Sequence, residues 1–204
     1  MRINKKKFLY LISPNRINEY FFRDLKRVLH TKKIAFFQLR LKKENQNNKL
    51  KIAKKVQKIC KNFKVKFVIN DDPNLAKQVN ADGCHLGQND MSIIDARKIL
   101  KKKIIGVTCH NSINLAKIAK KKNADYIAFG AFNSTKTKKV KYKANIIIIK
   151  KFKKTSRIPV VAIGGINNLN YKKLLLNKAD FLAISGYVWK NKILKPIEAI
   201  KLLK

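Results

Sequence analysis

Two neighbouring stretches decide the fold of this chain: Phe67-Val68-Ile69-Asn70-Asp71-Asp72-Pro73 and Ala81-Asp82-Gly83-Cys84-His85-Leu86-Gly87-Gln88-Asn89-Asp90. In both, a short apolar run is followed by acidic residues. Residues 65–69 and 83–86 predict two buried strands, and Asp72 and Pro73 predict the start of a short helix between them. A strand, helix, strand order implies a right-handed crossover, which places the two strands side by side and parallel.

The carboxyl ends of two such strands lie at the same edge of the sheet. Asp71 and Asp90 would meet there and could share a hard cation such as Mg²⁺. Alternatively, both residues could serve only to form turns, where Asp is common. From these stretches alone, the two interpretations stay open.

The rest of the chain repeats the same alternation of short apolar runs and helically spaced segments. Strands are predicted at Phe8–Ile12, Ile34–Leu39, Val65–Ile69, Gly83–Leu86, Ile104–Thr108, Tyr126–Phe129, Pro159–Ile163 and Phe181–Ile184. Helices are predicted at Glu19–Leu29, Asn48–Cys60, from Pro73, Ser92–Leu100, Asn114–Lys122, Asn145–Lys153, Tyr171–Leu176 and Ile193–Leu203. Eight strands alternating with eight helices fit a closed (β/α)₈ TIM barrel, with residues 1–204 as a single domain. A doubly wound open sheet is the alternative, because a sequence does not show closure.

Composition bounds the possible functions. The chain has 204 residues, 46% of them hydrophobic, so it can bury one sizeable core. Its net charge of +38 comes from 49 Lys and Arg against 11 Asp and Glu, which first suggests a nucleic-acid-binding protein. The lysines are spread over nearly every helical segment, without a basic block carrying interleaved aromatics. We therefore expect no specific nucleic-acid partner, and expect the field to attract phosphorylated small molecules.

The location of the protein is inferred from its cysteines and its apolar runs. Cys60, Cys84 and Cys109 have no metal-ligand spacing, and an odd count without a secretory signal indicates reduced thiols in a cytoplasm. No run approaches the roughly 18 apolar residues that a membrane helix needs. We expect a cytoplasmic protein without a membrane partner, and a homodimer is possible by analogy only.

The end of the second strand carries three alternating polar residues, Gln38, Arg40 and Lys42, which point to one face of an extended segment. An exposed polar edge would give the same alternation. In a strand buried on both faces, however, Arg40 needs an anionic partner. A diphosphate fits, since the guanidinium fork matches phosphate oxygens.

Other strand ends add polar groups to the same edge. Asn70 and Asp71 end the third strand, and Thr108 ends the fifth, where its hydroxyl could bind a polar ring or a phosphate. His110 could act as a general acid or base, or could be a hydrogen-bonded structural residue. His85, inside the end of the fourth strand, is interpreted as structural.

The last three strand ends predict a second anion site. Ser134-Thr135-Lys136-Thr137-Lys138 offers alternating hydroxyls and ammonium groups, while Gly164-Gly165 and Ser185-Gly186 allow close approach of backbone N–H groups. Loops after strands seven and eight commonly bind phosphate in such barrels. Two anionic ligands and a cation indicate transfer of a group with diphosphate leaving, by direct displacement, because no nucleophile–base pair is evident.

At this point the sequence resembles the thiamine phosphate synthase family. The resemblance rests on five segments that occur in order: Gln38-Leu39-Arg40-Leu41-Lys42, Ile69-Asn70-Asp71, Ala81 to Asp90, Thr135-Lys136-Thr137-Lys138 and Ala162-Ile163-Gly164-Gly165-Ile166. It implies a TIM barrel that uses Mg²⁺ to join hydroxymethylpyrimidine diphosphate to hydroxyethylthiazole phosphate, releasing diphosphate. The family mechanism is dissociative: a pyrimidine methylene cation forms, and the thiazole nitrogen captures it.

The resemblance also implies roles for individual residues. The implied pyrimidine diphosphate ligands are Gln38, Arg40, Lys42, Asn70, Thr108 and Lys138, of which Arg40, Lys42 and Lys138 would act on the leaving group. Asp71 and Asp90 resemble the Mg²⁺ ligands. The implied thiazole phosphate ligands are Thr135, Thr137, Gly165, Ile184 and Ser185. Residues 139–144 and 185–189 depart from the family pattern, on the thiazole side.

Two rival functions follow from the same residues. A thiazole tautomerase of the same superfamily would use His110 as acid and base, but such relatives tend to lack the full diphosphate and Mg²⁺ set. A basic nucleic-acid-binding protein would bind duplexes with a steep salt dependence. The nucleic-acid-binding hypothesis does not explain why the few acidic residues lie at strand ends.

Overall fold

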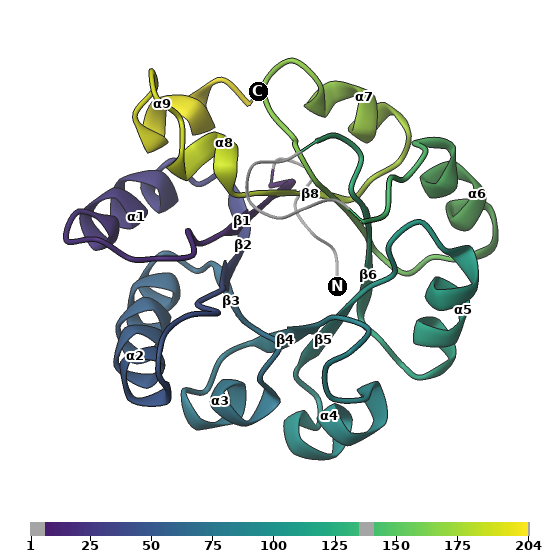
Figure 1. Cartoon of the computed structure of the whole chain (residues 1–204), viewed down its shortest axis with the longest axis horizontal. Coiled ribbons are helices and arrows are strands. Elements are labelled where there is room, and N and C mark those ends of the chain that lie inside the picture. Colours follow the sequence, from purple (N-terminus) through teal and green to yellow (C-terminus); the bar gives the residue numbers. More distant parts are fainter. Residues whose placement is uncertain (1–6, 135–140, 204) are drawn as a thin grey trace.

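The computed structural model describes residues 7–134 and 141–203, and these form a closed barrel of parallel strands (Figure 1). The strands are β1 (Leu9–Ile12), β2 (Ile34–Leu39), β3 (Lys66–Asn70), β4 (Gly83–Leu86), β5 (Ile104–Thr108), β6 (Tyr126–Gly130), β7 (Val160–Ile163) and β8 (Phe181–Ile184). Each pairs with the next in chain order, and β8 pairs with β1. The predicted TIM barrel is confirmed, and the open doubly wound sheet is wrong.

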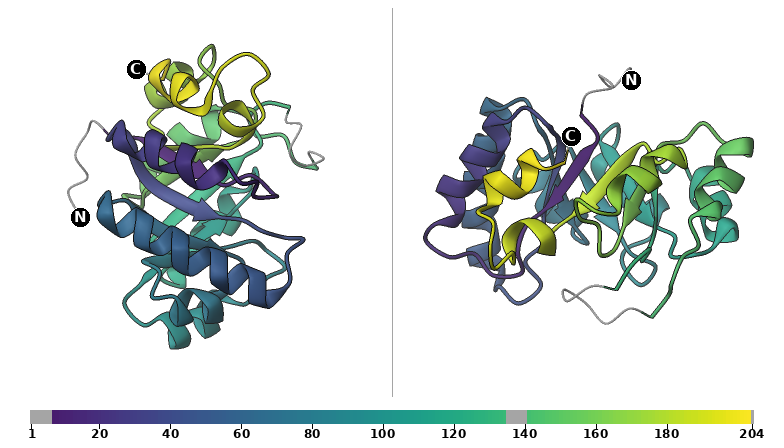
Figure 2. Two further views of the ribbon diagram at one scale, coloured as in Figure 1. Left: turned by 90° about the vertical axis from the view of Figure 1, so that its left-hand side faces the viewer. Right: turned by 90° about the horizontal axis from the view of Figure 1, so that it is seen from above.

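Helices surround the barrel, as the side views show (Figure 2). They are α1 (Phe21–His30), α2 (Gln46–Asn62), α3 (Pro73–Gln78), α4 (Ile93–Leu100), α5 (Ile113–Lys121), α6 (Ile147–Thr155), α7 (Tyr171–Leu176), α8 (Gly186–Trp189) and α9 (Pro196–Lys201). The isoleucine-rich segment before β7 is helical, as its place between two parallel strands requires.

The structure corrects the predicted end of the chain. The last helix begins at Pro196, not at Ile193. The side chain of Asn191 accepts the N–H groups of Ile193 and Leu194, each at 3.0 Å, and so holds a turn where helix was predicted. The short helix α8 was not predicted; Trp189 on it donates its ring N–H to the Ile12 carbonyl at 2.7 Å and closes the end of β1.

Alternating side chains of the strands divide the core into two layers. One lies between strands and helices and contains Cys60, Cys84 and Cys109, which are buried and free. The other fills the barrel interior with Tyr10, Ile12, Phe36, Val68, Tyr126, Ala128, Val161, Phe181 and Ala183. Because side chains fill the interior, a substrate would have to bind at the rim of the barrel.

Three aspartates close the amino-terminal end of the barrel by one repeated arrangement. Asp82, Asp125 and Asp180 each directly precede an even-numbered strand, and each accepts a backbone N–H of the preceding odd-numbered strand. The donors are Phe67 at 2.9 Å, Ile105 at 2.8 Å and Val160 at 2.7 Å. The partner cations of the three are Lys66, Arg97 and Lys153. Each of the three aspartates thus joins two neighbouring strands.

Side-chain caps fix the helices that follow β3 and β4. Asp72 accepts the N–H of Leu75 at 2.9 Å, and Pro73 is the first helical residue, as predicted. Ser92 accepts the N–H of Asp95 at 3.2 Å at the start of α4. These caps set the chain directions on either side of Asp71 and Asp90.

No helix within residues 7–134 and 141–203 has the length and apolar character needed to cross a membrane.

Candidate functional site

Charged side chains from three successive units meet at the carboxyl-terminal rim of the barrel. Lys42, after β2, places its ammonium 2.9 Å from a carboxylate oxygen of Asp71, which directly follows β3. Asp71 lies beside Asp90, from the turn after β4, close enough for each carboxyl group to shift the pKa of the other. A hollow of about 220 Å³ opens here, and Lys42, Lys49 and Asp71 are among its lining residues. The structure therefore brings together the acids and one of the cations that the sequence had placed at this edge.

Backbone geometry fixes both acids. Asp71 has a positive φ of 64°, a conformation that short polar side chains tolerate, and its N–H donates to the His85 carbonyl at 2.8 Å. Asp90 accepts the Gly87 N–H at 2.6 Å. A side chain at position 87 would press against the Asp90 carboxylate, so the glycine makes room for it.

The two carboxyl groups ionise differently. Burial raises the pKa of Asp71, but hydrogen bonds with Lys42 and Asp90 lower it further, so this pKa lies below its ordinary value. Burial and the hydrogen bond with Asp71 raise the pKa of Asp90. Two adjacent carboxylates repel, which opposes the ionisation of both at once.

This pair fits a divalent cation with few protein ligands. Both groups are oxygen donors of the kind that Mg²⁺ prefers. Within the described ranges, no group of three or more His, Cys, Asp or Glu side chains could enclose a metal ion. The donor set suits Mg²⁺, which usually keeps several waters and also binds substrate phosphates.

Arg40 lies beside this pair, with its guanidinium donating to the Asn15 side-chain oxygen at 2.5 Å. Burial lowers the pKa of Arg40, while the charge of Asp71 opposes that shift. Its backbone N–H donates to the Ser13 hydroxyl at 2.9 Å. Asn15 was missed by the sequence reasoning, although its position in the loop after the first strand could have suggested it.

Gln38 lies deeper than Arg40 and Lys42. Its side chain is only 2% exposed and donates to the Tyr10 hydroxyl at 3.3 Å. β2 ends at Leu39, so only Gln38 of the three residues lies in the strand, and Arg40 and Lys42 follow it. Asn70 lines the hollow beside Asp71.

Thr108 ends β5, and its hydroxyl lies 2.8 Å from Nε2 of His85. His85 is buried between Thr108 and Tyr126, so the interpretation of His85 as a structural residue agrees with its position. His110 has a φ of 50° and packs on Tyr142 with the ring centres 4.3 Å apart.

The predicted thiazole side is described in part. Gly164 and Gly165 have positive φ values of 107° and 59°, and side chains there would collide with residues 131–134 after β6. Ser185 donates its hydroxyl to the Ser13 carbonyl at 3.1 Å. Ile184 is buried in the core outside the barrel, so its backbone is the part that can face a ligand. Thr135, Thr137 and Lys138 lie outside the described residues.

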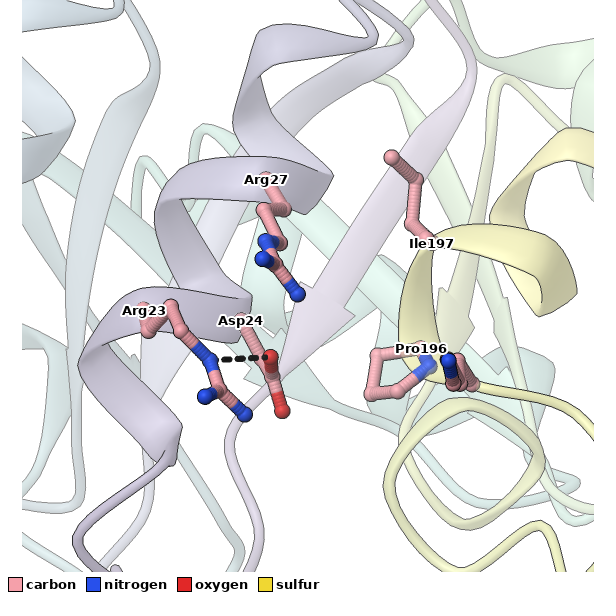
Figure 3. A pocket seen from close by; sticks show the side chains of 6 residues that line it. Arg23, Asp24, Arg27, Pro196 and Ile197 are labelled. Carbon is pink, nitrogen blue, oxygen red and sulfur yellow. Dashed lines mark hydrogen bonds and ion pairs between the residues drawn. The ribbon is translucent and has the colours of Figure 1, made fainter.

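Another hollow, of about 320 Å³, lies on the outer ring between α1 and α9 (Figure 3). Arg23 there pairs with Asp24 at 3.4 Å, and Arg27 faces Pro196 and Ile197 across the hollow. Although larger, this hollow lies away from the strand ends. We assign the candidate site to the rim, where the acids and cations converge.

Comparison with known proteins identifies the family. The family model described as thiamine monophosphate synthase matches residues 9–188. A thiamine-phosphate synthase of Pelagibacter ubique (strain HTCC1062) is 67% identical, and the alignment covers 100% of both chains. The chain belongs to the thiamine monophosphate synthase family. A second relative, the thiamine-phosphate synthase of Erythrobacter litoralis (strain HTCC2594), is 42% identical over 89% of this chain and 87% of its own.

The fold agrees with membership of the thiamine monophosphate synthase family. Thiamine phosphate pyrophosphorylase from Pyrococcus furiosus superposes with a TM-score of 0.86 at 29% identity, covering 98% of this chain and 94% of that one. Within this family the chain is an enzyme, a transferase of thiamine biosynthesis. The family resemblance drawn from the sequence motifs is thereby confirmed.

Proposed function

We propose that the chain joins hydroxymethylpyrimidine diphosphate to hydroxyethylthiazole phosphate in an Mg²⁺-dependent reaction that forms thiamine phosphate and releases diphosphate. The observation that carries the proposal is the contact of Lys42, Asp71 and Asp90 beside the hollow at the rim. Two neighbouring acids, next to cationic side chains, suit a diphosphate bound through a divalent cation.

Asp71 and Asp90 would hold the Mg²⁺. When bound, the ion offsets negative charge on the diphosphate oxygens. Lys42 contacts Asp71 in the structure, and we propose that it exchanges this partner for the diphosphate when substrate binds. The charge of Asp71 acts on the pKa of Arg40, so the two side chains lie near each other. The Arg40 guanidinium adds a fork of N–H donors for phosphate oxygens. We add Lys138 to these catalytic cations because of its place in the Thr-Lys-Thr-Lys motif.

The remaining residues would position the two organic rings. We assign Gln38, Asn70 and Thr108 to the pyrimidine substrate. We assign to the thiazole phosphate Thr135, Thr137, Gly165, Ile184 and Ser185. The leaving diphosphate takes the electron pair of the broken C–O bond, and the thiazole nitrogen then captures the methylene cation. Holding both rings in one site supplies much of the acceleration.

The proposal is tested by incubating the protein with both substrates and Mg²⁺ and detecting thiamine phosphate by mass. We expect product and diphosphate in equal amounts, and none after addition of a chelator. Isomerisation of a thiazole carboxylate phosphate without diphosphate release would support the tautomerase instead. Salt-sensitive duplex binding without any turnover would support the nucleic-acid-binding protein. The cytoplasmic location and the homodimer stay predictions.

A further inference from the structure

A continuous chain of buried hydrogen bonds crosses the barrel interior and joins two residues of the rim. Gln38 on β2 donates to the Tyr10 hydroxyl at 3.3 Å, and the Tyr10 and Tyr126 hydroxyls are 2.8 Å apart. The Tyr126 hydroxyl is 2.9 Å from Nδ1 of His85, and Nε2 of His85 is 2.8 Å from the Thr108 hydroxyl. Both ends of the chain are candidate substrate ligands, while its middle lies below the rim.

The fold makes room for this chain. Tyr10, Tyr126 and His85 are 2%, 3% and 8% exposed, so bulk water does not replace these hydrogen bonds. Gly106 on β5 lies against the Tyr126 ring, and any side chain at position 106 would overlap that ring. The His85 and Tyr126 rings stack with centres 5.6 Å apart. Each member is therefore held in one orientation.

The chain has a direction because Gln38 donates at one end. The amide nitrogen of Gln38 is the donor to Tyr10, so the single Tyr10 hydrogen is available for Tyr126. A Tyr126 hydroxyl that accepts from Tyr10 keeps its own hydrogen for Nδ1 of His85. The two ring nitrogens of His85 face the neutral hydroxyls of Tyr126 and Thr108, and a neutral ring carries one N–H. With Nδ1 accepting, that N–H is on Nε2 and donates to Thr108.

We propose that this chain, which we call the Gln38–Thr108 relay, holds His85 as the Nε2–H tautomer and so leaves the Thr108 hydroxyl hydrogen free to donate at the rim. The Thr108 oxygen accepts from His85, so its own hydrogen must find another acceptor. The reverse direction would have Thr108 donate to His85 and offer the rim only lone pairs. Tyr10, Tyr126 and His85 are therefore positioning residues that act through Thr108.

The consequence for binding rests on the proposed function, in which Thr108 contacts the pyrimidine diphosphate. A hydroxyl fixed as a donor suits a ring nitrogen or a phosphate oxygen, which are acceptors. It would be poorly matched to the exocyclic amino group of an aminopyrimidine, which is a donor. The relay thus determines which edge of the substrate can form a hydrogen bond with Thr108.

The tautomer is tested without substrate, by ¹⁵N NMR of the histidine side chains. The chain has 3 histidines, and loss of one set of ring signals in a His85→Gln variant assigns those of His85. Near neutral pH we expect a protonated Nε2 and an unprotonated Nδ1. An Nδ1–H tautomer or a doubly protonated ring would overturn the relay. This outcome does not depend on the reaction that the protein catalyses.

The action through Thr108 is tested by a double-mutant cycle on kcat/KM for the pyrimidine substrate. Tyr126→Phe removes one hydroxyl from the middle of the relay and keeps the ring, and Thr108→Val removes the hydroxyl at its end. We expect each variant to lose about tenfold, the effect of one lost hydrogen bond. The double variant should lose about as much as Thr108→Val alone, because Tyr126 acts only through that hydroxyl. Losses that multiply would overturn the proposal.

Tyr20→Phe is the matched control, since it deletes the same hydroxyl from an exposed ring on the outer surface. We expect it to keep both the activity and the His85 signals of the wild type. Tyr126→Phe should shift the His85 nitrogens toward a mixture of tautomers. Unchanged His85 signals in a folded Tyr126→Phe protein would overturn the relay. If the wild type makes no thiamine phosphate, the proposed function fails while the NMR result still decides the tautomer.

Discussion

Asp71 and Asp90 illustrate how a residue acquires its chemistry from its neighbours. Each alone could be an ordinary turn residue. In the structure the contact with Lys42, and then that with Asp90, lowers the pKa of Asp71 against the effect of burial, whereas burial and the contact with Asp71 raise the pKa of Asp90. Two carboxyl groups placed this close suit a shared cation such as Mg²⁺.

We expect Asp71→Ala and Asp90→Ala each to lower Mg²⁺-dependent diphosphate release by about a hundredfold or more, because each removes one of the two carboxylates proposed to hold the metal ion. The measurement is initial rate against Mg²⁺ concentration, with thermal unfolding to show that the fold persists. Asp95→Ala is the control, since it removes the same charge from an exposed position on α4. Near-normal turnover in either site variant would reject the metal assignment.

His110 lies near the rim but packs on Tyr142. We expect His110→Ala to keep substantial synthase activity, because no proton transfer by this ring is needed in a displacement that releases diphosphate. Steady-state rates with both substrates check this. A fall to background would make His110 catalytic and would favour the tautomerase mechanism.

His85 should make stability depend on pH. Burial lowers its pKa from 6.5 to about 4, with the charge of Asp71 opposing, so the unfolded state binds a proton that the folded state does not. The stability due to neutral His85 is complete above the unfolded pKa and is lost as pH falls toward the folded pKa. The loss approaches about 3 kcal/mol.

The test is the urea midpoint measured from about pH 7 to about pH 4.5, in wild type and in His85→Asn. The wild type should lose more stability than the variant over this interval, because only the wild type has this ring to protonate. Parallel curves for the two proteins would show that His85 is not held neutral.

Among the elements, the odd and even strands of the barrel are joined in a repeated way at the amino-terminal end. Asp82, Asp125 and Asp180 follow an alanine in every case and accept an N–H from the preceding odd-numbered strand. The three acids at this end join strands, and we propose that Asp71 and Asp90 at the opposite end hold the metal ion. In a chain with 11 Asp and Glu, this division accounts for five of them.

We expect Asp180→Ala to lower the free energy of unfolding by about 1 to 2 kcal/mol, because the Val160 N–H loses a charged acceptor. Chemical denaturation measures the change, and Asp24→Ala on the surface of α1 is the matched control. Diphosphate release by the folded Asp180→Ala protein should stay close to that of the wild type. A stability loss no larger than that of the control would show that the contact with Val160 contributes little.

At the scale of the whole molecule, the net charge of +38 produces a repulsion that opposes folding. Like charges repel one another and so destabilise a compact state. At 0.1 M, salt largely screens the repulsion between charges that are more than roughly 10 Å apart. The six ion pairs of the described residues offset only a small part of this field.

We therefore expect the melting temperature to rise by several degrees between about 0.05 M and about 0.5 M NaCl, because screening removes repulsion in the folded state. Calorimetry or circular dichroism measures the change. KCl and choline chloride at the same ionic strength should give the same rise if screening is the cause. No rise, or a rise specific to one salt, would contradict this account.

Most of the fold could be predicted from the sequence because its signals are local. Short β-branched runs, the cap at Asp72 and the proline after it define strands and helix starts through nearest neighbours in the chain. The extra turn of helix after β8 and the start of α9 at Pro196 were missed, because the contacts of Trp189 with Ile12 and of Asn191 with its own loop determine them.

The sequence by itself determined the alternation of elements, the polar residues at the strand ends and the family motifs. Only the tertiary structure decided that the sheet closes, that Lys42, Asp71 and Asp90 touch, and that Gln38 and Thr108 are joined through Tyr10, Tyr126 and His85. The physical reason is that closure brings β1 beside β8 and turns the residues of distant strands toward one interior. The hydrogen bond between Tyr10 and Tyr126 spans 116 positions in the chain, and no local pattern encodes it.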